Sequence, residues 1–352
     1  MSHHQTQLGF KMPSQRIAIV GAGFAGLAVC YYLLRDFPCH VTLFDAQGIG
    51  SGASGIAAGL AHPYPGKENR LSWRGKQALQ ATKELLNVAA TCTGNSCYRT
   101  GLYRVATTQR QEKQFRMLAS KHLDDLKWRQ ASLFEKSMLL AQQGLFLPFG
   151  MTVDVNAYLK GLWAACEKLG AVFVLRAVSI ADLAAYDQVI IAAGAKSHLF
   201  FPKDTLPLKI NKGQLLQCEH LARHLLETSV IGNGYLAFHP AWNYCYLGST
   251  YEHNFQSEDP CLETAKPLIL NRAAAFMRCL PALKIVGCAA GLRAVHQKCY
   301  HPIVDRLTHA MWLFTGLGSR GLLYHAYLGH KLATALINRE VNLLPQEVRI
   351  RR

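Results

Sequence analysis

Three glycines near the start of the chain have the spacing of a dinucleotide-binding turn. Gly21, Gly23 and Gly26 form the motif G-x-G-x-x-G, and Asp45 follows about 20 residues later. In such a motif the first glycine permits a tight turn, the second lets the backbone approach a pyrophosphate, and the third lets a helix pack close to a strand. The helix N-terminus offers N–H groups to the anion, and the acid accepts hydrogen bonds from a ribose. We therefore expect a dinucleotide site here.

The residues around these glycines have the pattern of a strand, a helix and a second strand. Residues 17–20 are apolar and β-branched, residues 27–34 have helical spacing, and residues 41–44 form another apolar run. Residues 17–34 carry no charge, so a membrane span is the alternative, but three glycines at this spacing argue against it. Residues 1–15 are polar and lack the apolar core of a signal peptide. We expect neither a leader nor a membrane span.

The charge and cysteine content of the chain bound its class. Its 352 residues, enough for roughly two domains, hold 38 Lys and Arg against 22 Asp and Glu, a net charge of +16. This excess indicates an anionic partner, either nucleic acid or a membrane surface, although a merely solvated basic surface is an equal alternative.

Eleven cysteines without a secretory signal predict reduced thiols in the cytoplasm. No C-x-x-C or H-E-x-x-H motif occurs, so no metal is expected. The sequence specifies no oligomeric state.

Later segments continue the α/β pattern. We expect a helix over residues 154–170, capped by Asp154 and ended by Gly170, then strands over 171–175 and 188–193. A strand over 311–315, a glycine-rich run over 316–322 and a helix over 324–338 form a unit similar to the first. A second helix N-terminus beside glycines would direct further N–H donors at a ligand.

The remaining segments predict a second, mostly antiparallel unit. Strands are expected over residues 101–106, 213–218, 234–238 and 244–247, and helices over 70–91 and 262–280. Residues 108–143 have poor periodicity and are interpreted as helix and loop. Residues 48–60 are rich in small side chains, so we expect a bulky group to pass close to their backbone.

Five separated motifs, taken in order, resemble the FAD-dependent D-amino-acid oxidase superfamily, which includes glycine oxidase and sarcosine oxidase. They are G-A-G-F-A-G at residues 21–26 with Asp45, G-A-S-G-I-A-A-G at 52–59, V-I-I-A-A-G at 189–194, G-L-R at 291–293 and G-L-G-S-R-G-L at 316–322. The last motif and residues 206–214, 234–235 and 247–252 look most similar to the oxidase half of the bifunctional tRNA 5-methylaminomethyl-2-thiouridine biosynthesis proteins. These 352 residues contain no methyltransferase half, and I-A-A-G-L-A-H-P-Y-P at 56–65 is nearer the general amino-acid oxidase pattern.

The resemblance implies an α/β fold class with an α+β second domain. It implies a discontinuous Rossmann-type FAD/NAD(P)-binding domain over residues 14–62, 145–205 and 287–342, and a substrate domain with a mostly antiparallel β-sheet over 63–144 and 206–286. The cofactor would be non-covalent FAD. For the adenosine and pyrophosphate part of the cofactor, the implied contacts are Gly21, Gly23, Phe24, Ala25 and Gly26 at the pyrophosphate, Asp45 at the ribose and Val174 near the adenine. For the flavin part they are Ser54, Ala57 and Ala58 at its side, and Gly318, Ser319, Arg320, Gly321 and Leu322 beneath the isoalloxazine. Ala193 and Gly194 would line the crossing back to the sheet.

For the reaction, the resemblance implies oxidation of a carbon–nitrogen bond by hydride transfer to flavin N5. Arg293 lies where the family places a guanidinium that clamps a substrate carboxylate; a structural ion pair is the alternative. Tyr235, Tyr246 and His239 lie on predicted substrate-domain strands and are candidates for the pocket wall, although a tyrosine on a strand is more often simply packed.

Three further side chains near these motifs are weaker candidates. His62 follows the small-residue segment and would either contact the flavin or be structural. Cys288 and Cys299 lie near Arg293, but neither clearly matches a position of covalent flavin attachment in the relatives.

Three functions remain open. The first is an enzyme that acts on the carboxymethylaminomethyl group of a tRNA uridine, favoured by the basic charge and the most similar motifs. The second is an oxidase or dehydrogenase of a small substrate, a free amino acid or N-methyl amino acid, favoured by the general superfamily motifs. The third is a non-catalytic flavoprotein module for binding or assembly, against which Arg293 argues because such a module needs no substrate clamp.

Overall fold

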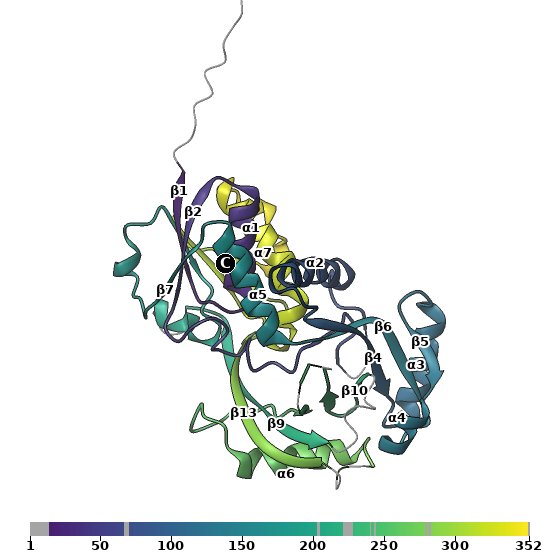
Figure 1. Ribbon diagram of the computed structural model, residues 1–352. Helices are drawn as coiled ribbons and strands as arrows, with labels where there is room; N and C mark the ends of the chain where they lie inside the picture. The colour runs from purple at the N-terminus through teal and green to yellow at the C-terminus, as the bar shows by residue number, and fades with distance from the viewer. Residues whose placement is uncertain are drawn as a thin grey trace, which may run out of the picture.

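The computed structural model describes residues 14–66, 70–202, 205–220, 228–239, 241–242, 244–278, 280 and 283–350. The polar segment of residues 1–13 and the terminal Arg351 and Arg352 lie outside this part. The chain forms two sheets, one above the other in Figure 1, with helices packed on each.

The first sheet has six strands in the order β14-β15-β8-β1-β2-β7. All neighbours are parallel except β14 and β15, which are antiparallel. The central strands read as continuous apolar runs because both of their faces are buried. Their bounds are β1 Gln15–Val20, β2 Cys39–Asp45, β7 Val172–Leu175, β8 Gln188–Ile191, β14 Ile303–Arg306 and β15 Met311–Thr315.

Three helices cover one face of this sheet: α1 (Phe24–Asp36), α5 (Val155–Lys168) and α7 (Gly321–Ile337) (Figure 1). Helix α2 (Gly75–Thr93) packs against α5 and α7. The predicted cap of α5 is confirmed, because the Asp154 side chain accepts a hydrogen bond from the Ala157 N–H at 3.0 Å. Gly170 follows this helix with a φ of 96°, a left-handed conformation that favours glycine.

The second sheet has the order β13-β9-β12-β11-β10-β4-β6-β3, and β5 pairs with β6. Neighbours are antiparallel, apart from the parallel pair of β4 and β10. Its strands are β3 Leu60–Ala61, β4 Tyr98–Val105, β5 Lys127–Gln130, β6 Gln143–Val153, β9 Leu208–His220, β10 Ser229–Ile231, β11 Tyr235–Ala237, β12 Cys245–Gly248 and β13 Leu283–His296. Its helices are α3 Gln109–Lys121, α4 Leu133–Met138 and α6 Leu262–Ala274.

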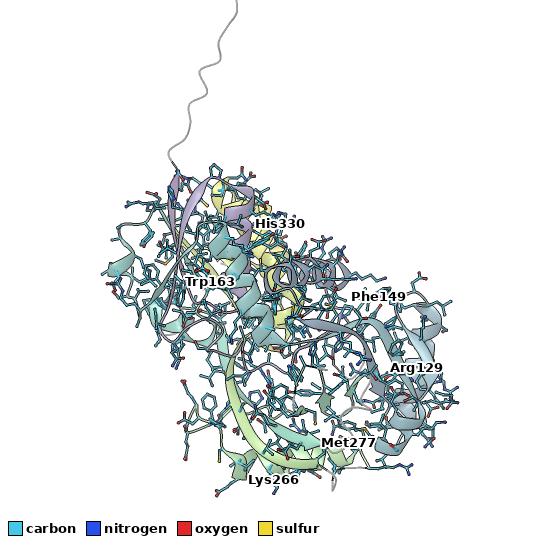
Figure 2. All side chains as sticks on the ribbon, in the orientation of Figure 1. Arg129, Phe149, Trp163, Lys266, Met277 and His330 are labelled. Atoms are coloured by element: carbon cyan, nitrogen blue, oxygen red, sulfur yellow. The ribbon has the colours of Figure 1, made fainter. Side chains whose placement is uncertain are left out.

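Separate hydrophobic cores lie on the two sheets. The larger core joins the first sheet to α1, α5, α7 and α2, and Trp163 of α5 packs at its margin (Figure 2). Another core, which includes Met277, lies between the second sheet and α6. Short 3₁₀ segments complete the chain: η1 Ala181–Leu183, η2 Gly194–Phe200, η5 Gly318–Arg320, η6 Val341–Leu343 and η7 Gln346–Val348.

The predicted α/β class and the antiparallel second sheet are confirmed. Strand β6 was not predicted, because Gly144, Pro148 and Gly150 interrupt its apolar pattern. The helix expected over 70–91 begins only at Gly75, and the helix expected over 262–280 ends at Ala274. The domain boundaries stay a prediction. Two of the predicted boundaries fall at residues 144/145 and 286/287, within strands β6 and β13 of the second sheet.

Candidate active site

The first glycine turn lies at the carboxyl ends of two central strands. Gly21 follows β1 with a φ of 109°, and a Cβ at this position would collide with the Ala192 carbonyl oxygen after β8. The next residues, Ala193 and Gly194, lead away from β8 beside this turn. Because β1 lies between β2 and β8, the strand order reverses here, and open α/β sheets bind ligands in the crevice at such a point.

The N-terminus of α1 opens on this crevice. Gly23 begins the helix without a side-chain cap, and its first turn, which includes Ala25, contains no acid. A Cβ at Gly23 would lie 2.8 Å from Ser54 Oγ, and the Phe24 N–H donates to that oxygen at 3.0 Å. A Cβ at Gly26 would collide with the carbonyl oxygen of Gly21, so the helix and the turn are in direct contact. A helix end with bare glycine backbone, whose first N–H alone is bonded to Ser54 and whose first turn has no acid, fits the pyrophosphate of a dinucleotide.

Asp45 joins the glycine turn to the loop that follows β2. Its Oδ2 accepts the Ala22 N–H at 2.8 Å, and its Oδ1 accepts the Gln47 and Gly48 N–H groups at 2.9 and 3.0 Å. A carboxylate oxygen has two lone pairs, so Oδ2 retains an acceptor position that suits a ribose hydroxyl. The fit of the described residues to FAD therefore extends from the pyrophosphate to the ribose.

A second helix N-terminus meets the first. Gly321 begins α7, and a Cβ there would lie 3.0 Å from the Phe24 ring. Like α1, α7 has no side-chain cap and no acid in its first turn. The preceding turn contacts β13, because a Cβ at Gly318 would lie 2.8 Å from Val295 Cγ1 and Leu317 forms a β-bridge with Val295.

The other predicted cofactor residues lie around these two turns. Ser319 is exposed, the Arg320 guanidinium lies 5.3 Å from the Tyr300 ring centroid, and the Leu322 carbonyl accepts the Thr82 hydroxyl at 2.7 Å. In the small-residue loop, Ala57 packs against the larger core and Ala58 is buried beside the second sheet. Val174 pairs with Phe44 at the edge of the first sheet.

One face of the second sheet is lined with small residues opposite the loop of residues 48–60. A Cβ at Gly291 would lie 3.2 Å from Ala53 Cα, and Ala58 packs with Leu215 in a shared apolar cluster. Side chains alternate between the faces of a strand, so cross-strand pairing identifies the members of this face. They include Gly213 and Leu215 of β9, Gly248 of β12, and Gly287, Ala289 and Gly291 of β13. The small side chains let the loop and the Arg293 guanidinium approach the backbone of the sheet closely.

Arg293 lies on the same face, between the two contacts that β13 makes with the glycine-containing loops. Gly291 meets Ala53 on one side, and Val295 meets Gly318 on the other. The half-buried Arg293 donates from Nη2 to Ser249 Oγ at 3.4 Å, and no carboxylate of the described residues forms an ion pair with it. Such a guanidinium is suited to bind a carboxylate ligand through two parallel hydrogen bonds.

Tyr235 and Tyr246 lie on the same face of the second sheet as Arg293. Of the two, Tyr235 is the one that interacts with Arg293 and Ser249. Burial raises the pKa of Tyr235, while Arg293 and a hydrogen bond with Ser249 act in the opposite direction. The Tyr246 and Trp242 rings meet edge to face with their centroids 4.9 Å apart, and burial raises the pKa of Tyr246. We conclude that Tyr235 is the better placed of the two to meet a ligand at Arg293.

The weaker candidates lie at the margins. His62 has a buried Nδ1 without a hydrogen-bond partner, and burial together with Arg104 lowers its pKa to about 3. The His239 ring lies 5.5 Å from the Trp242 ring, centroid to centroid, at a tilt of 45°, and burial lowers the pKa of His239. Cys288 Sγ donates to Gln214 Oε1 at 3.7 Å on the opposite face of β13, while the Cys299 N–H donates to His296 Nδ1 at 3.2 Å.

Three residues beside Arg293 were missed as site residues by the sequence reasoning. The ring centroid of Tyr251 lies 5.9 Å from Arg293 Cζ, and the Tyr251 hydroxyl accepts a hydrogen bond from Asn211 Nδ2 at 2.9 Å. Ser249 contacts Arg293 directly. The sequence signals were the segments of residues 206–214, which contains Asn211, and 247–252, which contains Ser249 and Tyr251, and both were quoted for the resemblance alone.

Two structural features are absent from the described residues. No helix in this part of the chain has the length and apolar character to cross a membrane. Nor do three His, Cys, Asp or Glu side chains gather there in an arrangement that could hold a metal ion.

Comparison with known proteins agrees with this architecture. The chain is 26% identical over 340 residues to the tRNA 5-methylaminomethyl-2-thiouridine biosynthesis bifunctional protein MnmC of Maricaulis maris (strain MCS10), covering 91% of this chain and 52% of that protein. The chain thus spans about half the length of the curated relatives it matches.

Solved structures share the fold. Glycine oxidase from Geobacillus kaustophilus superposes with a TM-score of 0.78 at 21% identity, covering 93% of this chain and 96% of the oxidase. Glycine oxidase from Bacillus cereus ATCC 14579 superposes with a TM-score of 0.79 at 18% identity, covering 96% and 99%. Residues 16–335 match the DAO family, described as FAD dependent oxidoreductase. Because this match spans both sheets and both helix N-termini, the chain belongs to the DAO family of FAD-dependent oxidoreductases, and its cofactor is FAD.

Proposed function

We propose that this protein oxidises the carbon–nitrogen bond of a glycine-like secondary amine, with the carboxymethylaminomethyl group of a tRNA wobble uridine as its substrate. The observation that carries the proposal is the placement of Arg293. Its guanidinium is half-buried, lies on β13 between the contacts to Ala53 and Gly318, and has no carboxylate partner among the described side chains. A glycine-like amine carries the carboxylate that such a group would bind.

In this mechanism the protein mainly binds and orients. FAD supplies a hydride acceptor when bound. Arg293 would hold the substrate carboxylate with two hydrogen bonds, and the bare backbone of Gly213 beneath the guanidinium would fix its position. Tyr235, which packs in the apolar cluster beside the loop, and the more exposed Tyr251 would wall the site. Holding the reacting C–H bond in one orientation is worth several kcal/mol, on the order of 7–11 at best.

The choice of tRNA rests on two observations. A net charge of +16 suits a polyanion, and the similarity to MnmC, whose printed name describes tRNA 5-methylaminomethyl-2-thiouridine biosynthesis, covers 91% of this chain. Free cysteines throughout the described chain fit the expected cytoplasmic location of such an enzyme.

A second candidate is the oxidation of a free amino acid or N-methyl amino acid. The superposition on two glycine oxidases favours it, because the arrangement of sheets and helices is shared over nearly the full length. The same Arg293 clamp would serve this substrate, so the clamp does not separate the two candidates.

Anaerobic bleaching of the flavin separates them. The purified yellow protein would be mixed with glycine, sarcosine, D-alanine, proline and tRNA that carries carboxymethylaminomethyluridine. We expect rapid bleaching by the tRNA. Bleaching by small amino acids alone would reject the tRNA substrate, and bleaching by none of the compounds would favour a non-catalytic module.

The clamp is tested by Arg293→Ala and Arg293→Lys. We expect both to retain FAD and to raise the KM of the bleaching substrate by at least tenfold, because lysine cannot make the bidentate contact. Arg110→Ala, which changes an exposed arginine on α3, is the matched control. Loss of FAD from Arg293→Ala would instead identify a structural residue.

A further inference from the structure

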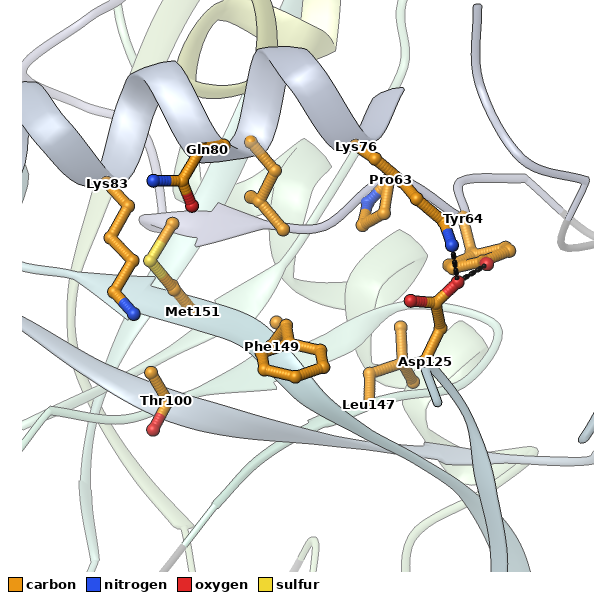
Figure 3. A pocket seen from close by; sticks show the side chains of 12 residues that line it. Pro63, Tyr64, Lys76, Gln80, Lys83, Thr100, Asp125, Leu147, Phe149 and Met151 are labelled. Carbon is orange, nitrogen blue, oxygen red and sulfur yellow. Dashed lines mark hydrogen bonds and ion pairs between the residues drawn. The ribbon is translucent and has the colours of Figure 1, made fainter. Parts of the chain in front are cut away.

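A pocket of about 220 Å³ lies between α2 and strands β4 and β6, apart from the Arg293 site (Figure 3). In the second sheet β13, which carries Arg293, forms one edge, whereas β6 and β3 lie at the opposite edge. The pocket therefore belongs to a different part of the protein surface, and none of the cofactor residues described above lines it.

One wall of this pocket is apolar and carries an exposed aromatic ring. Leu147, Phe149 and Met151 line it from β6 (Figure 3), and Leu79 lines it from α2. Phe149 is 57% exposed, and it lies at the outer side of the molecule below α2 (Figure 2). An exposed phenyl ring in a pocket wall presents its face to a planar ligand.

The polar groups lie at the two ends. Asp125 Oδ2 accepts from the Tyr64 hydroxyl at 2.8 Å and pairs with Lys76 Nζ at 2.5 Å. Figure 3 shows the other carboxylate oxygen of Asp125 directed away from these contacts, toward the Phe149 side. Lys83 lies at the far end near Thr100, and no carboxylate among the described residues forms an ion pair with it.

We propose that this pocket binds an unpaired nucleotide of RNA. The base would stack on Phe149, the free Asp125 oxygen would accept an N–H of its edge, and Lys83 would contact a flanking phosphate. Stacking on an aromatic side chain combined with a cation for the backbone is the usual chemistry of single-stranded nucleic-acid recognition. The volume lies below the ~300–1,000 Å³ of drug-sized ligand pockets, which suits a single base.

Charge distinguishes a nucleotide from other planar ligands. The pocket holds two lysines and one acid, and the whole chain carries a net charge of +16, so an anionic ligand is favoured. The RNA assignment rests on the proposed function, which requires an RNA substrate. A free nucleoside monophosphate has the same chemistry, and the experiment separates these two sources.

The test uses the FAD-loaded full chain and two probes: a fluorescein-labelled anticodon stem–loop RNA with an unmodified wobble uridine, and adenosine 5′-monophosphate. Phe149→Ala is expected to weaken RNA binding about tenfold, and Phe149→Tyr to bind within about twofold of the unchanged protein, because it keeps the stacking ring. Leu199→Ala, at another exposed apolar side chain, is the matched control and should bind normally.

Lys83 is tested through the salt dependence of RNA binding. Lys83→Gln is expected to lower the slope of log K against log salt by about one, as for the loss of one phosphate contact. Lys284→Gln, at a lysine whose side chain is 76% exposed on β13, should leave the slope unchanged.

Flavin bleaching by the small amine that reacts fastest is measured in parallel. Normal bleaching with weakened RNA binding in Phe149→Ala supports the pocket. RNA binding through Phe149 without bleaching by any RNA would reject the proposed reaction and still support the pocket. Unchanged RNA affinity in Phe149→Ala would overturn the proposal. So would an equal loss in Leu199→Ala, or Phe149-dependent binding of the monophosphate alone.

Discussion

The guanidinium of Arg293 rests directly on Gly213 of the neighbouring strand. A Cβ built on Gly213 would collide with Cζ, Nη1 and Nη2 of Arg293. Gly213 pairs with Gly291 across β9 and β13, so the guanidinium lies over a strip of bare backbone. The absence of a side chain at residue 213 thus sets the position of the proposed clamp.

Gly213→Ala should displace the clamp and leave the fold intact. The new methyl group meets the end of a flexible side chain, which can move, whereas the backbone need not. We expect normal FAD content and a KM for the amine substrate raised about tenfold, since misorientation removes the bidentate contact. Steady-state kinetics and the flavin spectrum measure both quantities.

The control for that variant is Gly287→Ala. Gly287 lies on the same face of β13, but its Cβ would meet Gln217 Oε1 at 2.5 Å rather than Arg293. Its KM should stay within about twofold of the unchanged protein by the same orientation argument. Equal effects of the two substitutions would show that the loss reflects general disturbance of the sheet.

Gly26→Ala should remove FAD. The added methyl group would collide with the Gly21 carbonyl oxygen, which is backbone and cannot rotate away. We expect the helix to shift from the turn, a loss of about 1–3 kcal/mol in the free energy of unfolding, and little flavin absorbance after purification. Yellow Gly26→Ala protein would contradict the prediction.

Asp45→Asn should weaken both the cofactor site and the fold. Both carboxylate oxygens accept backbone N–H groups, so one of them would be replaced by an NH₂ that faces a donor. Because Asp45 is only half-buried, the cost to the fold should be at the low end of the ~1–3 kcal/mol for an unsatisfied buried group, and we expect the Kd for FAD to rise at least tenfold. Titration of the FAD-free protein measures it, with Asp124→Asn at an exposed carboxylate as the control.

Stability should fall as the pH drops below about 6.5. His325 is completely buried between Tyr158 and the Gly321 carbonyl, and burial lowers its pKa from 6.5 to about 4. The unfolded chain therefore takes up a proton between pH 6.5 and 4 that the folded chain does not. The contribution of His325 to the free energy of unfolding is fully present above pH 6.5. About 2 kcal/mol of this contribution is lost between pH 7 and pH 5.

Urea unfolding at these two pH values tests this linkage. His325→Gln should remove this part of the pH dependence, while His309→Gln at an exposed site should not. His62, whose pKa is lowered to about 3, contributes with the same sign and should persist in both variants. An unchanged pH dependence in His325→Gln would contradict the assignment.

Much of the local structure around the predicted cofactor site could be predicted because its determinants are local. The turn at Gly21, the cap at Asp154 and the strand–glycine–helix unit that ends in α7 depend on residues within a few positions of one another. Sequence spacing therefore predicted them. Strand β6 escaped prediction because its glycines and proline interrupt the alternation, and only pairing with β4 makes it a strand.

The surroundings of the proposed clamp depend instead on contacts between distant segments. The sequence by itself determined that a guanidinium follows a glycine at residues 291–293, and that small residues precede β3. Only the tertiary structure decided that Gly213 lies under Arg293, that Ala53 and Gly318 flank it, and that Phe149 opens into a separate pocket. Strand register and loop packing bring these residues together, and no local periodicity encodes a contact between residues far apart in the chain.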